Sequence, residues 1–297
     1  MTSGDYSAAD WILTDSPRTL FPTKLSRLVG VENGARTREL IEKSILPTEA
    51  RIKLLPQTPV LALKPQLAFR KTLRLDPLAE AFIYGWVNDH RKYFKVEGRH
   101  DNRASFGFSF RDGRPVDLSL AYRAFKAKTT ELKKTYRWMC RIDVQNYFNN
   151  IYHHFLCQWL SQRIDSAEEV KRFNYFGTSL ASGDSIGFFP QGIMPTKVVG
   201  SAYLDQFTKH GSLRSAVVVR FMDDIVLADD NAGVVRDDFL RLQESFASKN
   251  LFFNAAKTEF IPAADFDLPS DKLDDKADRS LSASIGRAED GRATVCG

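Results

Sequence analysis

Residues 215–230 have the sequence SAVVVRFMDDIVLADD, in which two short apolar runs flank the acidic pair Asp223-Asp224. Apolar, β-branched runs on both sides of a short polar break predict two strands joined by a tight turn. Adjacent carboxylates between apolar strands repel each other unless a cation neutralises them, and a hard divalent metal suits that purpose. Taken alone, however, an Asp-Asp pair is more often a plain turn.

A third carboxylate, Asp143, ends the apolar stretch YRWMCRID, 80 residues before Asp223. If the strand that ends at Asp143 pairs beside the hairpin, three carboxylates converge at one edge of a sheet. Such a cluster suits two-metal phosphoryl transfer, in which one cation activates an attacking 3′-hydroxyl and the other steadies the leaving pyrophosphate.

Periodicity and turn residues predict further elements on both sides of these strands. We expect a strand over 67–76, a helix from Pro77 ending before Gly98, a loop or hairpin over 99–115, helices over 120–134, 155–164, 196–209 and 235–246, and a strand over 251–261. Helices mixed with a few antiparallel strands predict an α+β fold.

Composition limits the possible classes of protein. The chain has 297 residues, 43% of them hydrophobic, which suffices for one large globular domain or two small ones. No apolar run approaches the roughly 20 residues that cross a bilayer. The three cysteines form no CxxC pair, which argues against a disulfide framework or a structural zinc site. We therefore expect a soluble, cytoplasmic protein with no membrane partner.

The net charge of +5 is unevenly distributed along the chain. Residues 51–142 contain 20 Lys and Arg against 8 Asp and Glu, whereas residues 221–297 contain 9 against 16. A basic half of this kind suits binding to a phosphate backbone. On charge alone, a merely solvated surface explains it equally well.

Four segments follow one another along the chain: IDVQNYFNNI, FPQGIMPT, RFMDDIVLA and NAAKTEF. In this order the chain resembles the reverse transcriptase family, whose palm motifs A to D are matched by Asp143, Gln191-Gly192, Asp223-Asp224 and Lys257. The resemblance covers residues 65–260 or thereabouts. It implies a right-hand polymerase palm, with an antiparallel sheet and helices, together with fingers.

The resemblance also implies a set of site residues. The implied catalytic residues are Asp143, Asp223, Asp224 and Lys257. The implied ligands of Mg²⁺, or of Mn²⁺, are Asp143, Val144, Asp223 and Asp224. The implied substrate-binding residues are Arg70, Lys71, Arg74, Phe148, Gln191 and Gly192.

Two departures from the pattern of viral RNA polymerases favour deoxynucleotides. By the resemblance, Phe148 takes the position that in the family lies beneath the sugar of the incoming nucleotide, where a bulky ring would collide with a 2′-hydroxyl. Gly200 stands where those RNA polymerases carry an asparagine that binds the 2′-hydroxyl. Without the motif context, Phe148 would be interpreted as an ordinary core aromatic.

The remaining candidates each have a physical rationale and an ordinary alternative. Gly192 allows close backbone approach, and the helix after it offers free N–H groups, although such loops are common. Lys257 could protonate the leaving pyrophosphate, yet most lysines are simply solvated. Arg70, Lys71 and Arg74 could bind triphosphate or template oxygens, which guanidinium groups suit well, although one of the three could be incidental. The aromatic loop from Arg103 to Arg114 could stack on single-stranded bases or pack beneath the fingers.

Within the family, RLDPLAEAFIYGWV and FGFSF are similar to segments of bacterial abortive-infection and defence-associated reverse transcriptases. Some members of that class synthesise DNA without a template or from a protein primer. We expect a helical lead-in over 1–60, fingers and palm over 61–262, and an acidic, disordered or truncated tail over 263–297. Because few residues follow Phe260, we expect the thumb to be absent or truncated, and an oligomer or partner chain to supply it.

The resulting hypothesis is an RNA-directed DNA polymerase in bacterial anti-phage defence, using an RNA template, a DNA or protein primer and deoxynucleoside triphosphates. The main alternative is a non-catalytic nucleic-acid-binding subunit that needs a partner for its thumb. A nucleotide cyclase ranks last, because its usual Gly-Gly-acid-acid hairpin is absent.

Overall fold

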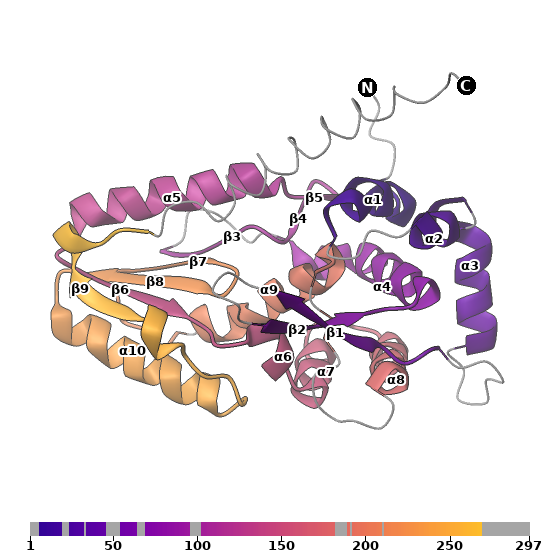
Figure 1. The fold of residues 1–297 in the computed structure, drawn as a ribbon. Helices are drawn as coiled ribbons and strands as arrows, with labels where there is room; N and C mark the ends of the chain where they lie inside the picture. Colours follow the sequence, from indigo (N-terminus) through magenta and orange to yellow (C-terminus); the bar gives the residue numbers. More distant parts are fainter. Residues whose placement is uncertain are drawn as a thin grey trace, which may run out of the picture.

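The computed structural model describes residues 6–19, 24–32, 34–45, 54–63, 69–95, 102–181, 189–190, 192–209 and 211–268. Within these ranges, the side chains of residues 18, 44, 45, 62, 63, 69 and 70 are not described. The fold is α+β, as predicted, with a central sheet between helices (Figure 1).

The central sheet has five strands in the order β3-β7-β8-β6-β9. They are β3 (Arg103–Phe106), β6 (Trp138–Asp143), β7 (Val217–Phe221), β8 (Asp224–Asp229) and β9 (Glu259–Pro262). Every neighbouring pair is antiparallel except β3 with β7, which is parallel. The hairpin predicted around Asp223-Asp224 is β7–β8, and β6 lies beside it.

Strand β3 corrects the expectation that 99–115 is only a loop or hairpin. A hairpin is present as β4 (Phe110–Arg111) and β5 (Arg114–Pro115), but Arg103–Phe106 joins the central sheet. A four-residue strand beside Gly and Arg carries little local signal, and its pairing with β7 decides its state. Phe106 and Phe110 are buried, so these rings pack inside the protein rather than stacking on bases.

Helices cover both faces of the sheet. Figure 1 shows α5 (Leu118–Thr135) along one face and α10 (Ala232–Ala247) along the other. Phe221 of β7 packs against Tyr122 and Phe125 of α5, with ring centroids 5.1 and 5.9 Å apart. The next side chain back, Arg220, bonds to α9 (Met194–Thr208) on the opposite face. Because neither face meets water, all five residues of β7 are buried.

The remaining elements lie mainly toward the end of the molecule away from β9 (Figure 1). The helices are α1 (Ala8–Asp15), α2 (Lys24–Arg27), α3 (Gly34–Leu40), α4 (Pro77–Asp89), α6 (Tyr147–Asn150), α7 (His153–Ser161) and α8 (Ala167–Ala181). Short 3-10 or π-helical turns are η1 (Ser16–Arg18), η2 (Leu28–Glu32), η3 (Ile41–Ile45) and η5 (Arg91–Phe94). A separate antiparallel hairpin joins β1 (Thr58–Leu63) and β2 (Phe69–Arg74).

Side-chain caps fix where the long helices begin. Asp76 accepts from the N–H of Leu78 at 2.8 Å, with Pro77 in the first turn of α4. That helix ends at Asp89, and η5 replaces the rest of the helix expected before Gly98. Asn231 caps α10, since its side chain accepts from the N–H of Gly233.

The segment 251–261 is only partly the strand that its composition predicts. Asn254 accepts from the N–H of Ala256 at 3.2 Å and starts the 3-10 turn η6 (Ala255–Lys257). Strand β9 begins at Glu259, after this turn. A side chain that bonds its own backbone competes with sheet pairing, which accounts for the difference.

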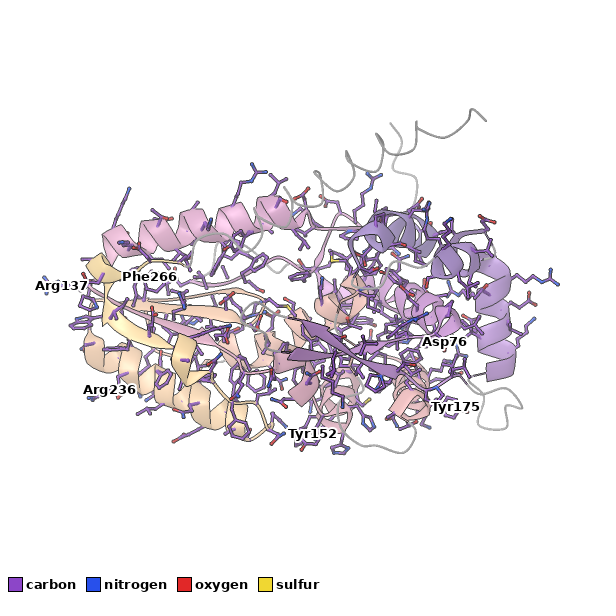
Figure 2. The ribbon with its side chains drawn as sticks, in the orientation of Figure 1. Asp76, Arg137, Tyr152, Tyr175, Arg236 and Phe266 are labelled. Carbon is purple, nitrogen blue, oxygen red and sulfur yellow. The ribbon has the colours of Figure 1, made fainter. Side chains whose placement is uncertain are left out.

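The packed chain continues beyond residue 262. The turn η7 (Ala263–Asp265) follows β9, and the N–H of Ala263 donates to the carbonyl of Arg137 at 2.9 Å. Phe266 is 1% exposed, and Figure 2 shows it at the same end of the molecule as Arg137. The division of the chain into three segments stays a prediction.

Among the described helices, none combines the length and the apolar character that a bilayer crossing requires.

Candidate active site

The acidic pair lies at the tip of the β7–β8 hairpin. Phe221 pairs with Asp224, which leaves Met222 and Asp223 as a two-residue turn. Met222 has a φ of +57°, in the left-handed region. Two-residue hairpins favour such turns because their twist matches that of the strands, although a left-handed methionine costs roughly 1 kcal/mol.

The strand of Asp143 lies beside this hairpin, as the sequence predicts. In the β6–β8 ladder Asp143 is the direct partner of Asp224. Directly opposed residues on neighbouring antiparallel strands point to the same face of the sheet. Asp223 is adjacent in the turn and interacts electrostatically with both of the other carboxylates.

The pKa of Asp223 shows how crowded these charges are. The pKa of this carboxyl is raised to about 7, first by burial and then by the nearby Asp224 and Asp143 carboxylates. Lys257 acts in the opposite direction, with a smaller effect. Near neutral pH the metal-free site therefore relieves its repulsion partly by keeping a proton on Asp223.

Two residues of the NAAKTEF segment bind the Asp143 carboxylate. The side-chain amide of Asn254 donates to Oδ1 at 3.1 Å, and Nζ of Lys257 lies 3.2 Å from Oδ2. The main-chain N–H of Asn254 also donates to the carbonyl of Asp143 at 2.8 Å. The sequence analysis missed Asn254, although an asparagine that starts the turn before Lys257 could have signalled it.

The donor set fits a hard divalent cation in its chemistry. Three carboxylates provide oxygen ligands, and the raised pKa of Asp223 reflects its burial and then the negative charge of Asp224 and Asp143. Val144 has a buried side chain without a donor atom, so it can offer only its main-chain carbonyl.

The carboxylates are nevertheless not preassembled around a cation. Within the described ranges, no three His, Cys, Asp or Glu side chains stand in a cation-binding arrangement. Asn254 and Lys257 engage both oxygens of Asp143. A cation shared with Asp143 therefore requires Lys257 to move away from it.

The predicted nucleotide loop is described only in part, because Gln191 lies outside the described residues. Gly192 has a φ of +118°, a conformation that favours glycine. The sequence predicts free N–H groups at the start of the helix that follows, α9. In the structure at least one of them is occupied. The N–H of Met194 donates to the Asp15 carboxylate at 2.8 Å, and the Tyr84 hydroxyl donates to the same oxygen.

Asp15 therefore anchors the start of α9 to α1 and α4. A buried carboxylate at a helix N-terminus is favoured by the free N–H groups and the helix dipole. The N-terminal segment, in which the sequence shows little function, thus supports the helix that follows the glycine loop.

Phe148 packs where α6 meets α9. It is 7% exposed, and its ring is nearly parallel to that of Phe189, with centroids 6.2 Å apart. A Cβ added at Gly200 would lie 3.2 Å from the Phe148 ring and 3.5 Å from the end of Met222. Glycine at this position lets the ring and the Met222–Asp223 turn approach the helix.

The basic strand β2 borders the same region. The side-chain amide of Asn149, in α6, donates to the carbonyl of Lys71 at 3.2 Å. Lys71 and Arg74 are exposed, whereas the side chain of Arg70 lies outside the described part of the chain. This position is compatible with the phosphate-binding role predicted for the strand.

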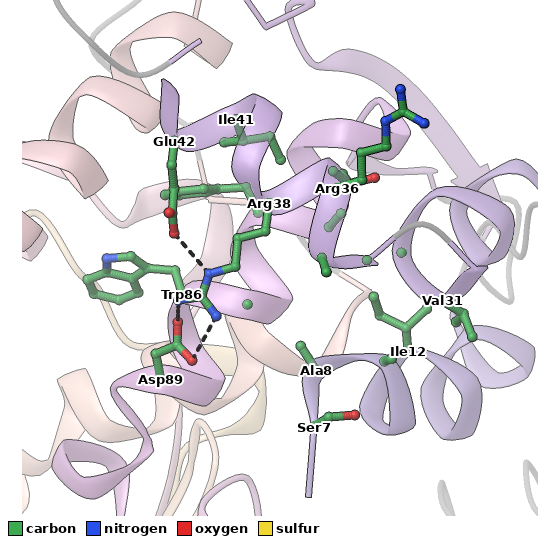
Figure 3. A pocket seen from close by; sticks show the side chains of 18 of the residues that line it. Ser7, Ala8, Ile12, Val31, Arg36, Arg38, Ile41, Glu42, Trp86 and Asp89 are labelled. Carbon is green, nitrogen blue, oxygen red and sulfur yellow. Dashed lines mark hydrogen bonds and ion pairs between the residues drawn. The ribbon is translucent and has the colours of Figure 1, made fainter. Parts of the chain in front are cut away.

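A cavity of about 840 Å³ lies elsewhere, between α1, α3 and α4 (Figure 3). One of its charged side chains, Arg38, donates to Glu42 at 2.9 Å and binds Asp89. Its lining includes none of the predicted site residues. The cavity is therefore separate from the carboxylate cluster.

Residues 99–268 match the family model described as reverse transcriptase (RNA-dependent DNA polymerase). No curated protein matches the sequence at a significant level.

Two telomerase structures are similar in part. Telomerase from Candida albicans, in complex with a fragment of telomeric RNA, matches at 10% identity and a TM-score of 0.48, over 76% of this chain and 46% of that one. Apo telomerase from Candida tropicalis matches at 11% identity and a TM-score of 0.42, over 76% and 48%. The chain thus spans just under half the length of each, and similarity at this level carries no argument about activity.

The raised pKa of Asp223 predicts how stability varies with pH in metal-free protein. The folded state keeps a proton up to about pH 7 that the unfolded chain releases near its ordinary value of 3.8. Stability should therefore fall as the pH rises through this window, by up to about 4 kcal/mol. Asp223→Asn removes the charge, so urea unfolding in EDTA should show the variant gaining on wild type from pH 4 to pH 7, with more of the gain above pH 5 than below it.

Asp230→Asn is a matched control, because it removes an acid at the other end of the hairpin. It should follow the wild-type pH dependence. If Asp223→Asn and wild type lose stability in parallel between pH 5 and 8, the carboxyl does not titrate as described.

Proposed function

Because this chain belongs to the reverse transcriptase family, we propose that it extends a primer with deoxynucleoside triphosphates, using RNA as the template. The observation that carries the proposal is the register of Asp143 with Asp224, beside Asp223 in the turn. The three carboxylates are the groups of this chain best suited to holding divalent cations.

In this proposal Asp143, Asp223 and Asp224 hold Mg²⁺ or Mn²⁺, with the main-chain carbonyl of Val144 as a further ligand. The bound cations would supply the Lewis acid that activates the 3′-hydroxyl and stabilises the pyrophosphate. Lys257 leaves Asp143 when the site is filled and turns to the phosphates. Its ammonium group can then give a proton to the leaving pyrophosphate.

Three segments provide the proposed substrate-binding residues. Arg70, Lys71 and Arg74 contact the triphosphate or the template with cationic side chains. Gln191 and Gly192 shape the nucleotide loop, where the positive φ of Gly192 supports close backbone approach. Phe148 excludes a 2′-hydroxyl. The close packing of its ring against Gly200 of α9, which fixes the position of the ring, supports this role.

Incorporation of labelled deoxynucleotides tests the polymerase activity. Full-length protein with Mg²⁺, a primed RNA template and labelled deoxynucleoside triphosphates should give a DNase-sensitive product. Asp223→Asn/Asp224→Asn should lower the rate by at least about 10³-fold, because it removes the charges that hold the cations. Asp230→Asn should retain the wild-type rate.

Product formation that survives the double substitution would refute the assignment. Salt-dependent RNA binding without incorporation in either Mg²⁺ or Mn²⁺ would instead select the non-catalytic subunit.

Phe148→Val tests selection of the sugar. Removing the ring should raise the kcat/KM for ribonucleotides relative to deoxynucleotides by roughly 10- to 100-fold, equivalent to about 1–3 kcal/mol. The ratio is measured within each variant, so a lower folded fraction does not affect it. Phe148→Tyr keeps the ring and should keep the wild-type ratio, whereas an unchanged ratio in Phe148→Val would assign the ring to packing alone.

We extend the proposal to bacterial anti-phage defence and to synthesis that starts from a protein primer or proceeds without a template. The support is the similarity of RLDPLAEAFIYGWV and FGFSF to defence-associated members of the family. Phage should form fewer plaques on bacteria that express the wild-type chain than on bacteria that express Asp223→Asn/Asp224→Asn. Equal plaque counts would remove the defence role and leave the polymerase activity to the incorporation assay.

A further inference from the structure

Strand β7 carries one charged side chain among apolar neighbours. Arg220 follows three valines and precedes Phe221, and it is only 1% exposed. Burying a guanidinium group is costly unless it is paired with an anion and hydrogen-bonded. A strand that served only for packing would be more stable with an apolar residue here, so the partners of Arg220 indicate its purpose.

On one side, Arg220 is bound to helix α9. One terminal nitrogen donates to the carbonyl of Ser201 at 2.8 Å and forms an ion pair with Asp205. The other terminal nitrogen donates to the hydroxyl of Ser201 at 3.2 Å. Lys209 also lies 3.1 Å from Asp205, so this carboxylate is held between two cations.

On the other side, Arg220 reaches the catalytic turn. The nitrogen that binds the Ser201 hydroxyl also donates to the carbonyl of Met222 at 3.1 Å. That carbonyl belongs to the peptide group that joins Met222 to Asp223. Its orientation therefore helps to fix the direction in which the Asp223 side chain leaves the backbone.

The turn needs such support because its backbone is unfavourable. Met222 has a φ of +57°, a conformation that a non-glycine residue keeps only where its surroundings enforce it. Met222 also approaches α9 closely, because a Cβ at Gly200 would lie only 3.5 Å from the end of its side chain. A bond from Arg220 to the Met222 carbonyl holds this peptide against the helix.

The same turn of α9 also holds the segment after Asp143. The Tyr147 hydroxyl donates to the carbonyl of Gly200 at 2.6 Å. Arg220 binds the carbonyl of the next residue, Ser201. Two segments that carry the carboxylates are thus attached to consecutive carbonyls of one helix.

We propose that Arg220, anchored by Ser201 and Asp205, is a positioning residue that holds the Met222–Asp223 peptide so that Asp223 faces Asp143 and Asp224. The proposal rests on the proposed function for its catalytic consequence. Its structural content, the orientation of one carboxylate, can be measured without any polymerase activity.

Arg220→Lys is the decisive variant. Lysine keeps the charge next to Asp205 but has a single ammonium group, which cannot reproduce the fork that joins Asp205, Ser201 and Met222. The Mn²⁺ affinity of the full chain, measured by electron paramagnetic resonance, should fall roughly 10- to 100-fold in this variant. Losses of this size occur when groups that orient metal ligands are removed. Hydrogen exchange of the peptide over 217–225 should become faster in the same variant.

In the polymerase assay, Arg220→Lys should lower kcat up to about 100-fold, the effect of a misplaced catalytic group. It should also raise the Mg²⁺ concentration for half-maximal rate, while the KM for deoxynucleotides changes little. Asp205→Asn, which leaves the guanidinium group but removes its anchor, should move each quantity in the same direction.

Val218→Ala is the matched control. Val218 is buried on the same strand and on the same side as Arg220, and its truncation destabilises the strand without touching the turn. It should leave Mn²⁺ affinity and Mg²⁺ dependence as in wild type. A purely structural role for Arg220 predicts that all three variants affect Mn²⁺ binding only in proportion to their lost stability.

The outcomes separate this inference from the proposed function. If wild type binds Mn²⁺ through Asp223 but incorporates no nucleotide, the proposed function fails, and Arg220→Lys still decides the positioning role. Wild-type Mn²⁺ affinity in folded Arg220→Lys would overturn the positioning role. If wild type binds no Mn²⁺, Arg220 has no cation site to position and the inference is wrong.

Discussion

Repulsion among Asp143, Asp223 and Asp224 is the constraint on which the rest of the site depends. Pairing of β6 with β8 forces Asp143 and Asp224 into direct opposition, and the turn places Asp223 beside them. The chain compensates in three ways. Asp223 has a pKa raised to about 7, Lys257 forms an ion pair with Asp143, and Asn254 donates to the same carboxylate. A bound divalent cation would replace the first two of these, the proton on Asp223 and the Lys257 ammonium, because it supplies positive charge at the same oxygens.

Helix α9 holds this charged edge in place. Its N-terminus binds Asp15 of the N-terminal helix, and its middle binds Tyr147 and Arg220. These three residues come from segments far apart in the sequence, so a single helix connects the N-terminal helix α1, the segment after Asp143 and the Met222–Asp223 turn. The contacts are short hydrogen bonds to buried groups, and such bonds are expensive to leave unmade. A rigid helix of this kind can hold carboxylates close together against their repulsion.

The same residue types behave differently according to where the fold places them. Arg38 lines a cavity in which its charge is matched by Glu42 and Asp89, and that cavity contains none of the proposed site residues. The Lys71 side chain is exposed on a strand next to α6, where a cationic group can meet a phosphate. The size of a cavity is therefore a poorer guide to function here than the balance of charge around the carboxylates.

The sequence by itself determined the α+β class, the β7–β8 hairpin and the adjacent strand of Asp143. Each has a local signal: β-branched runs, a short acidic break, and a carboxylate at the end of an apolar stretch. It did not reveal β3, the 3-10 turn at Asn254, or the anchoring of α9 by Asp15 and Arg220. These features depend on partners far away in the chain, and a four-residue strand or a lone buried arginine has no periodicity to announce it. Only the tertiary structure decided them, because the free energy of a hydrogen bond or ion pair depends on which groups burial brings together.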